Sequence, residues 1–311
     1  MHEYLFVCNV LPGDDINPEI NTQKATYLAQ KGIMDALSQK VESLQVLSYP
    51  QYPIYPNSKI IYKNSCSRVE GNTEYVQIPT INLPVLRIVF RNFFFLVYIL
   101  KWCIRNRKAN KHVIQYNVSS PTLIVTLTAK LFKNTDVSAF LYDLGMPPTS
   151  YNYSKLKRLI YKIIDIQAKV LINRMDYAYV ITNNVAKDYA SNISTLLIDG
   201  GISEDVLNHI PLLDLRCKDK TICLLAGNLT ETNGVKLLLD ASRYVNDKNI
   251  EFWFAGKGDM VDLIKQEALI NPQISYKGFL TTDQLFKMYA SVDVLLNLRV
   301  MPNKEGIYLF Q

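Results

Sequence analysis

The sequence predicts an α/β protein in which parallel strands form sheets that helices cover. Two observations support this fold class. Short apolar segments recur along the chain, and segments with apolar residues at helical spacing stand between them. Strands that alternate with helices of about 10–15 residues are typical of β-α-β units on a parallel sheet. Such a sheet binds ligands at the carboxyl ends of its strands, so we look for function there.

The alternation is clearest in the last third of the chain. Apolar strand-like runs begin at Thr221, Ile250, Ile274 and Val292. We expect helices between them, over residues 235–244, 260–269 and 281–290. The last of these opens on Thr281-Thr-Asp-Gln284, a Ser/Thr-x-x-Glu/Gln capping box that marks a helix start.

The first two hundred residues follow the same scheme less regularly. We expect strands over residues 4–10, 112–116, 137–141, 177–182 and 195–198. Helices are expected over residues 21–39, 84–108, 122–132, 153–175 and 183–190, and a loop over the Tyr- and Pro-rich residues 46–57. The polar stretch 212–219 is the predicted linker. It would separate a first domain of residues 1–211 from a second of residues 220–311.

Composition restricts the class of protein. The chain has 311 residues, 49% hydrophobic and 20% charged, so it can bury cores and is not a disordered protein. A net charge of +6 permits contact with phosphate or an anionic membrane, but it does not indicate a nucleic-acid-binding protein. The five cysteines form no Cys-x-x-Cys pair and the amino terminus resembles a strand rather than a signal peptide, which favours a cytoplasmic protein. His2, His112 and His209 are scattered without metal-ligand spacing, so no metal site is expected.

The helix over residues 84–108 combines basic and aromatic residues on one side. At 100° per residue, one arc holds the following side chains: Arg87, Arg91, Phe94, Tyr98, Lys101 and Arg105. An interfacial helix at the inner face of the cell membrane needs this combination, because phosphate headgroups meet cations and rings lie at the acyl boundary. A core helix with a basic solvent face would show the same pattern. Both interpretations stay open, and the helix over residues 153–175 adds a second basic surface.

Glycines stand where the first two strands of the last third turn into helices. Gly227 follows the first strand, and Gly256 and Gly258 follow the second. Glycine lets the backbone approach an anion, and the following helix start offers unpaired N–H groups to phosphate. The pair of turns indicates a nucleotide-type ligand, although tight turns alone would also need glycine.

Together these segments resemble the donor-binding domain of the family 4 (group 1) glycosyltransferases. The matching segments, in order and spacing, are residues 225–241, 254–259, 276–280, 285–289 and 290–296. The resemblance implies the GT-B architecture, two Rossmann-like domains facing a cleft, of which the first is the acceptor domain. It also implies a retaining, metal-independent transfer from a nucleotide-diphosphate sugar, with no cofactor. The implied donor-binding residues are Gly227, Asn228, Asn233, Gly256, Lys257 and Gly258.

This sequence departs from the family pattern at two of these positions. Where much of the family has an Arg and a Lys that support the diphosphate, this chain has Asn228 and Asn233. An amide donates hydrogen bonds but brings no charge, so we expect weaker support of the leaving group.

Two carboxylates are candidates for catalysis. By the resemblance, Glu305 is the first of two glutamates seven residues apart, and its partner would fall beyond Gln311; alternatively, residues 308–310 lead into the segment before that glutamate. Either alignment predicts that the second domain is truncated. Asp143 follows the expected strand 137–141 and could contact the acceptor hydroxyl, although Asp-Leu-Gly-Met-Pro-Pro is also an ordinary turn.

The sequence therefore predicts a glycosyltransferase of bacterial surface-polysaccharide assembly, acting on a glycan or lipid-linked acceptor at the membrane surface. Two alternatives stay open: a nucleotide-sugar epimerase of the same fold, and an inactive fragment or half that needs a second chain. Conversion of a nucleotide sugar without an acceptor would favour the epimerase. Absence of donor binding would favour the fragment.

Overall fold

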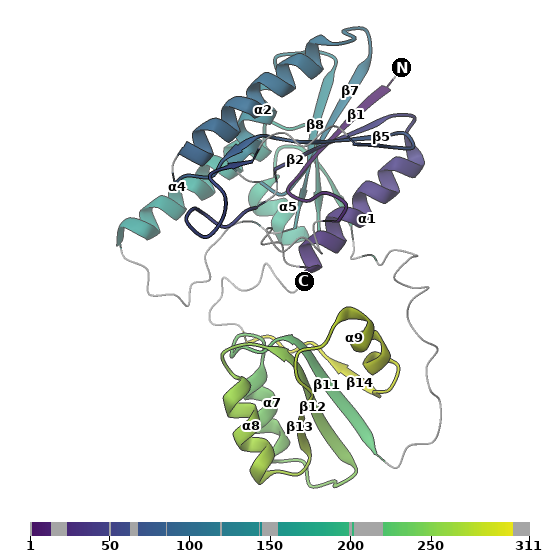
Figure 1. Cartoon of the computed structure of the whole chain (residues 1–311), viewed down its shortest axis with the longest axis vertical. Helices are drawn as coiled ribbons and strands as arrows, with labels where there is room; N and C mark the ends of the chain where they lie inside the picture. The colour runs from purple at the N-terminus through teal and green to yellow at the C-terminus, as the bar shows by residue number, and fades with distance from the viewer. Residues whose placement is uncertain are drawn as a thin grey trace. The chain divides into compact units, whose positions relative to one another are not determined.

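The computed structural model describes residues 2–13, 24–49, 51–62, 68–84, 86–118, 120–142, 144, 155–198, 201 and 220–300. These residues form two compact units, the first built from the chain up to residue 198 and the second from residues 220–300 (Figure 1). The predicted linker, residues 212–219, lies outside the described residues, so the predicted domain boundary stays a prediction.

Among the described residues, the first unit is built on an eight-stranded sheet of order β10-β9-β8-β7-β1-β2-β5-β4. Its neighbouring strands are parallel except for the β4–β5 pair, which is antiparallel. The strands are β1 (His2–Cys8), β2 (Leu44–Ser48), β4 (Arg68–Glu70), β5 (Thr73–Gln77), β7 (Asn110–Tyr116), β8 (Thr135–Leu141), β9 (Tyr177–Val180) and β10 (Ser194–Leu197). A separate antiparallel pair joins β3 (Ile61–Tyr62) to β6 (Thr80–Ile81).

Helices cover both faces of this sheet (Figure 1). They are α1 (Lys24–Lys40), α2 (Leu86–Ile104), α3 (Ser120–Ala129), α4 (Lys155–Ile172) and α5 (Asn183–Tyr189). Successive residues of a strand point to opposite faces, and β1 shows this directly. Leu5 and Val7 pack with α2, α3 and the end of α4, whereas Phe6 and Cys8 pack with α1. A doubly covered sheet explains why the central strands are nearly continuous apolar runs.

Lys111, near the start of β7, is a fully buried cation. Its Nζ donates hydrogen bonds to the carbonyl oxygens of Trp102 and Arg105, in the last turn of α2 and just beyond it. It also forms an ion pair with Glu3 at 3.3 Å, and it lies 4.6 Å from the centroid of the Trp102 ring. A buried charge is tolerated only when it is paired and hydrogen-bonded, and the carbonyl end of a helix favours a cation.

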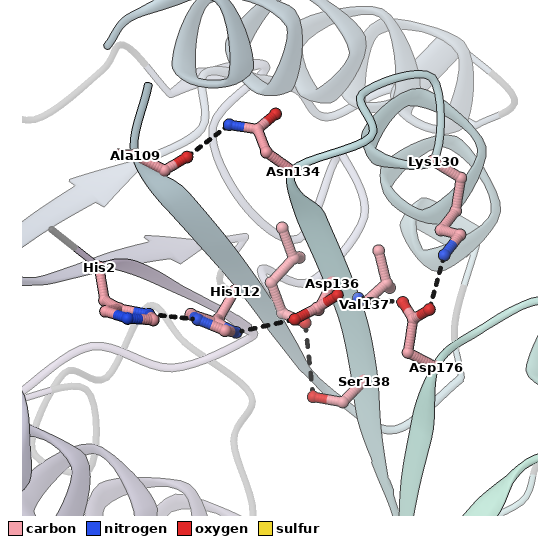
Figure 2. A network of polar contacts seen from close by, with 10 residues as sticks. His2, Ala109, His112, Lys130, Asn134, Asp136, Val137, Ser138 and Asp176 are labelled. Atoms are coloured by element: carbon pink, nitrogen blue, oxygen red, sulfur yellow. Dashed lines mark hydrogen bonds and ion pairs between the residues drawn. The ribbon is translucent and has the colours of Figure 1, made fainter. Parts of the chain in front are cut away.

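Polar side chains join the amino ends of three neighbouring strands (Figure 2). Nδ1 of His2 lies 2.9 Å from Nε2 of His112, whose Nδ1 lies 3.4 Å from Asp136 Oδ2. The two rings stack at 5.2 Å between centroids. In the sequence these histidines are scattered, with no metal-ligand spacing. Parallel pairing of β1 with β7 puts Tyr4 opposite His112 and so brings His2, two residues earlier, within reach of His112 across a separation of 110 residues.

Asp176 continues this edge toward β9 (Figure 2). Its carboxylate accepts a hydrogen bond from the backbone N–H of Val137 at 2.8 Å, and it forms an ion pair with Lys130 at 2.7 Å. The carboxylate therefore satisfies a strand N–H and a cation at once, which fixes the start of β9 beside β8.

Among the described residues, the second unit is built on a four-stranded parallel sheet of order β13-β12-β11-β14. Its strands are β11 (Thr221–Asn228), β12 (Ile250–Lys257), β13 (Ile274–Tyr276) and β14 (Val294–Leu296). Helices α7 (Val235–Ser242) and α8 (Val261–Ile270) pack on one face, and α9 (Thr282–Tyr289) packs on the other (Figure 1). The predicted capping box is confirmed, since Thr281 and Gln284 cap each other's backbone N–H at the start of α9.

The element order matches the sequence prediction except in one region. Residues 46–57 were expected to form a loop, but Val46 to Ser48 belong to β2, and β3, β4, β5 and β6 were not expected at all. Val46 is fully buried between β1 and β5, so tertiary packing outweighs the Tyr- and Pro-rich local signal.

Candidate functional site

The second unit has a topological switch point between β11 and β14. From β11 the chain proceeds to β12 and β13 on one side of the sheet, and then crosses to β14 on the other. Ligands of open α/β sheets bind in the crevice outside the carboxyl ends of the strands at such a point. The segments that follow the two strands meet here, where the backbone N–H of Val300 donates to the carbonyl oxygen of Thr232 at 3.0 Å.

Gly227, Gly256 and Gly258 lie at this end of the sheet but differ in what requires them. A Cβ at Gly256 would lie less than 3.0 Å from the carbonyl oxygen of Gly227, and one at Gly258 would lie equally close to the carbonyl oxygen of Leu229. Gly256 therefore lets β12 lie close to Gly227 in β11, and Gly258 lets the turn after β12 pack on the turn after β11. Gly227 has φ +134° and open space where its Cβ would be, so its backbone stays accessible to a ligand.

Asn228 and Asn233 stand in the loop between β11 and α7. Asn233 Nδ2 donates to the carbonyl oxygen of Asn228 at 2.5 Å, so the amide of Asn233 is held against the end of β11. Its Oδ1 accepts a hydrogen bond from Nη1 of Arg299, which follows β14. The Asn228 side chain is exposed. The structure thus brings a cation to the place where the sequence offered only amides.

Lys257 ends β12 beside the same turn. Its Nζ lies 5.1 Å from the centroid of the Phe279 ring, and its carbonyl oxygen accepts from the backbone N–H of Leu229 at 2.9 Å. Tyr276 supports this turn, since its hydroxyl donates to the carbonyl oxygen of Gly256 at 2.7 Å. All six predicted donor-binding residues therefore lie at the carboxyl ends of β11 and β12 or in the turns that follow.

The first unit has its own switch point, between β1 and β7. After β1, Asn9 is held by the buried Gln30, whose Oε1 accepts from the Asn9 backbone N–H at 3.0 Å. After β7, Asn117 has φ 59° and its Oδ1 accepts from the backbone N–H of Tyr142 at 2.9 Å. Burial raises the pKa of the Tyr142 phenol. Asn9 and Asn117 were not among the predicted site residues; short polar residues directly after buried strands are the signal that would have found them.

Both predicted catalytic carboxylates fall outside the described residues. Asp143 follows Tyr142, and Glu305 follows the segment that ends at Val300. Their roles stay predictions. Among the residues that the structure covers, no cluster of three or more His, Cys, Asp or Glu side chains has a geometry that could hold a metal ion.

The predicted membrane-facing residues in the amino-terminal half of α2 have contacts within the first unit. Arg87 donates from Nη1 to the carbonyl oxygen of Tyr52 at 2.8 Å, and Arg91 lies 5.2 Å from the centroid of the Tyr49 ring. Burial lowers the pKa of both guanidinium groups. The segment after β2 therefore covers the side of α2 that was expected to face lipid.

In the carboxyl-terminal half of the predicted membrane-facing stripe, two side chains are half-buried and two are exposed. Phe94 and Tyr98 are half-buried against the core, and burial raises the pKa of the Tyr98 phenol, whereas Lys101 and Arg105 are exposed. The exposed apolar side chains of α2 are Leu86, Ile88, Val89, Phe93, Leu96 and Ile104. A helical wheel alone does not show which of the two largely apolar arcs of α2 faces the sheet.

The amphipathic pattern is clearer on α4. Its exposed apolar residues are Leu159, Ile160, Ile163, Ile164, Ile166 and Val170, which span an arc of about 160° at 100° per residue. Exposed Lys155, Arg158 and Lys162 lie on the adjacent arc. Near its end, α4 is anchored by the buried Leu171 and Ile172. In the part of the chain that the structure describes, no helix combines the length and apolarity needed to cross a bilayer.

No protein-family profile matches the sequence, and no curated protein matches it. Solved structures do. The alpha,alpha-trehalose 6-phosphate synthase of Burkholderia multivorans is 12% identical with a TM-score of 0.59, covering 100% of this chain and 82% of that chain. The lipopolysaccharide outer core galactosyltransferase WaaB, in its apo form, is 12% identical with a TM-score of 0.56, covering 99% and 78%. Anabaena HepE in complex with UDP is 11% identical with a TM-score of 0.56, again covering 99% and 78%.

Likeness at this level of identity establishes the fold. The chain has the GT-B fold of two Rossmann-like α/β domains, and the predicted fold class is confirmed.

Proposed function

We propose that this chain is a glycosyltransferase, of the family 4 type, that transfers a sugar from a nucleotide-diphosphate donor to a glycan acceptor. One observation carries the proposal. At the switch point of the second unit, the accessible backbone of Gly227 lies near the amides of Asn228 and Asn233. The guanidinium group of Arg299 reaches the same loop from the segment after β14. Backbone N–H groups and cations at such a crevice suit a diphosphate. The GT-B fold, and a fold neighbour whose structure contains UDP, support the same ligand class.

The transfer requires a stabilised leaving group. The bond between sugar C1 and the diphosphate oxygen breaks, and the electron pair stays on the diphosphate. A new bond forms between C1 and the acceptor oxygen, which releases its proton. Donors aimed at the diphosphate lower this barrier, because they stabilise charge as it develops. We assign the backbone of Gly227 and the amide of Asn228 to the diphosphate, with Asn233 beside them, and we take retention of the anomeric configuration from the family resemblance.

We assign the two carboxylates in line with the resemblance. Asp143, next to Tyr142 at the carboxyl end of β8, would contact the acceptor hydroxyl. Glu305 would lie near the donor sugar. These roles come from their positions in the sequence.

The acceptor is proposed to be lipid-linked and used in surface-polysaccharide assembly, with the enzyme on the inner face of the membrane. The α4 surface supports this assignment, because a broad exposed apolar surface beside three exposed cations suits an interface with anionic lipid. Liposome flotation tests it. We expect Ile163→Gln with Ile166→Gln to reduce binding to vesicles containing phosphatidylglycerol, and Leu237→Gln, a comparably exposed residue of α7, to leave binding unchanged. Binding that is independent of anionic lipid and of these residues would contradict the membrane assignment.

The transfer itself is tested with radiolabelled UDP- and GDP-sugars and polyprenyl-diphosphate-linked saccharides. We expect label to move to the lipid phase only when both substrates are present, and the anomeric proton of the product to show retention. Conversion of the nucleotide sugar to its epimer without acceptor would instead indicate an epimerase. A chain that neither binds nor turns over any donor would overturn the proposal.

A further inference from the structure

The loop after β14 brings a cation to the loop after β11. Arg299 donates from Nη1 to Oδ1 of Asn233, and Asn233 donates from Nδ2 to the carbonyl oxygen of Asn228. One chain of hydrogen bonds thus connects a guanidinium group to both positions where the family resemblance implies cations. Arg299 is 66 residues from Asn233, and the parallel pairing of β11 with β14 brings the two together.

The residues on both sides of Arg299 are fixed against the same loop. A Cβ at Gly234 would lie less than 3.0 Å from the Leu298 Cβ, so only glycine, here at φ +77°, lets this segment approach. On the other side, the backbone N–H of Val300 is bonded to the carbonyl oxygen of Thr232. The position of Arg299 is therefore built into the packing of the two loops.

The surroundings of Arg299 differ from those of an arginine that serves the fold. Within the described ranges, Arg299 is exposed and forms no ion pair with a carboxylate. Arg243, at the opposite end of α7, is also exposed, and it pairs with Asp240 at 3.3 Å and with Glu267 at 2.5 Å. The charge of Arg243 is compensated by the protein. The charge of Arg299 lies beside the loop after β11, exposed and without an acidic partner in the described residues.

We infer that Arg299 supplies the positive charge that binds the donor diphosphate, in place of the two cations absent at Asn228 and Asn233. This inference rests on the proposed function. A guanidinium group stays charged at any physiological pH and presents its donors in a planar fork that matches phosphate oxygens. It donates hydrogen bonds to the diphosphate before and after the C1–O bond breaks, and its own bonds do not change. Asn233 is a positioning residue that orients the guanidinium group.

Calorimetric titration of the full chain with UDP, GDP and ADP tests the inference. We expect Arg299→Ala to weaken binding of the preferred nucleoside diphosphate by roughly 10- to 100-fold, the range of a charge-assisted hydrogen bond. Arg299→Lys should retain part of the affinity, and the matched control Arg243→Ala should bind like the unmodified chain. Affinity for the corresponding nucleoside, which lacks phosphate, should be the same in all four proteins.

A charge-transfer variant separates a ligand role from a structural one. Arg299→Ala combined with Asn233→Lys returns a cation to the loop after β11, so we expect it to recover affinity for the diphosphate relative to Arg299→Ala alone. Unchanged diphosphate affinity in Arg299→Ala, or equal losses for nucleoside and nucleoside diphosphate, would overturn the inference and leave the proposed function intact. If the unmodified chain bound none of the three nucleotides, the proposed function would fail and the inference with it.

Discussion

Lys111 in the first unit and Arg299 in the second are cations at opposite ends of the strands in their sheets. We call these two ends the amino edge and the carboxyl edge. Lys111 stands at the amino ends of its strands, fully buried, and is bonded to two backbone carbonyls and to Glu3. Arg299 stands beyond the carboxyl end of β14, exposed, with the amide of Asn233 as its hydrogen-bond partner. The protein compensates the first charge completely and the second only in part. The comparison indicates that the amino edge of the first unit holds the fold together, and it fits the proposal that the carboxyl edge of the second unit binds a ligand.

Replacing Lys111 should produce the largest loss of stability. Lys111→Met leaves the carbonyls of Trp102 and Arg105 and the carboxylate of Glu3 without their buried partner, which costs about 3–5 kcal/mol. Urea denaturation of the full chain, followed by far-UV circular dichroism, measures the loss. Lys108→Met removes an exposed cation just before β7 and is the control, expected to change stability by about 0.5 kcal/mol or less. Equal effects of the two substitutions would show that the buried charge does not stabilise the fold.

The glycines of the carboxyl edge provide the second test. Gly256→Ala puts a Cβ against the Gly227 carbonyl at φ +137°, so strain and overlap together should cost about 2–5 kcal/mol. Gly227→Ala meets open space and should cost only the backbone strain, about 1–3 kcal/mol. Denaturation of both variants under the same conditions gives the two values. If Gly227→Ala were the more damaging, the assignment of Gly256 to packing and Gly227 to the ligand would be wrong.

A smaller effect is expected at the histidine pair of the amino edge. Burial lowers the pKa of His112 from its ordinary value of 6.5, opposed by Asp136 and reinforced by His2. The unfolded chain then takes up a proton at higher pH than the folded chain does. The stability that neutral His112 contributes to the fold is therefore complete above pH 6.5, and it is lost as the pH falls through the lowered pKa of His112 in the folded chain.

The substitution His112→Gln should therefore flatten the dependence of the melting temperature on pH between about pH 5 and 7. Asp136→Asn, which removes the opposing charge, should steepen it. Identical pH profiles for the unmodified chain and His112→Gln would contradict this account.

Much of the fold could be predicted because local and tertiary signals agree. In the second unit, strands, helices and the capping box at Thr281 all follow from apolar periodicity and end signals. The strands from β2 to β6 were not predicted. Short segments rich in Tyr, Pro and polar residues carry little periodic signal, and pairing with neighbouring strands determines their structure.

The site was only half predictable, for a geometric reason. The glycines and amides lie within one turn of their strands, so the sequence places them directly. Arg299 lies on the far side of two β-α units, and only the strand order β12-β11-β14 brings it beside Asn233. An arginine directly after the strand that begins the other side of a switch point is the signal that could have found it. Without the strand order, the sequence does not show which residue this arginine lies beside.

Hydrogen–deuterium exchange of the full chain with saturating UDP, GDP or ADP tests the central claim most directly, because it locates the nucleotide. We predict that one of the three protects the segments around residues 225–236 and 292–300, at the carboxyl ends of β11 and β14. The segments around residues 2–8 and 109–116, at the amino edge of the first unit, should exchange at unchanged rates. Protection confined to the first unit, or no protection with any of the three nucleotides, would contradict the claim.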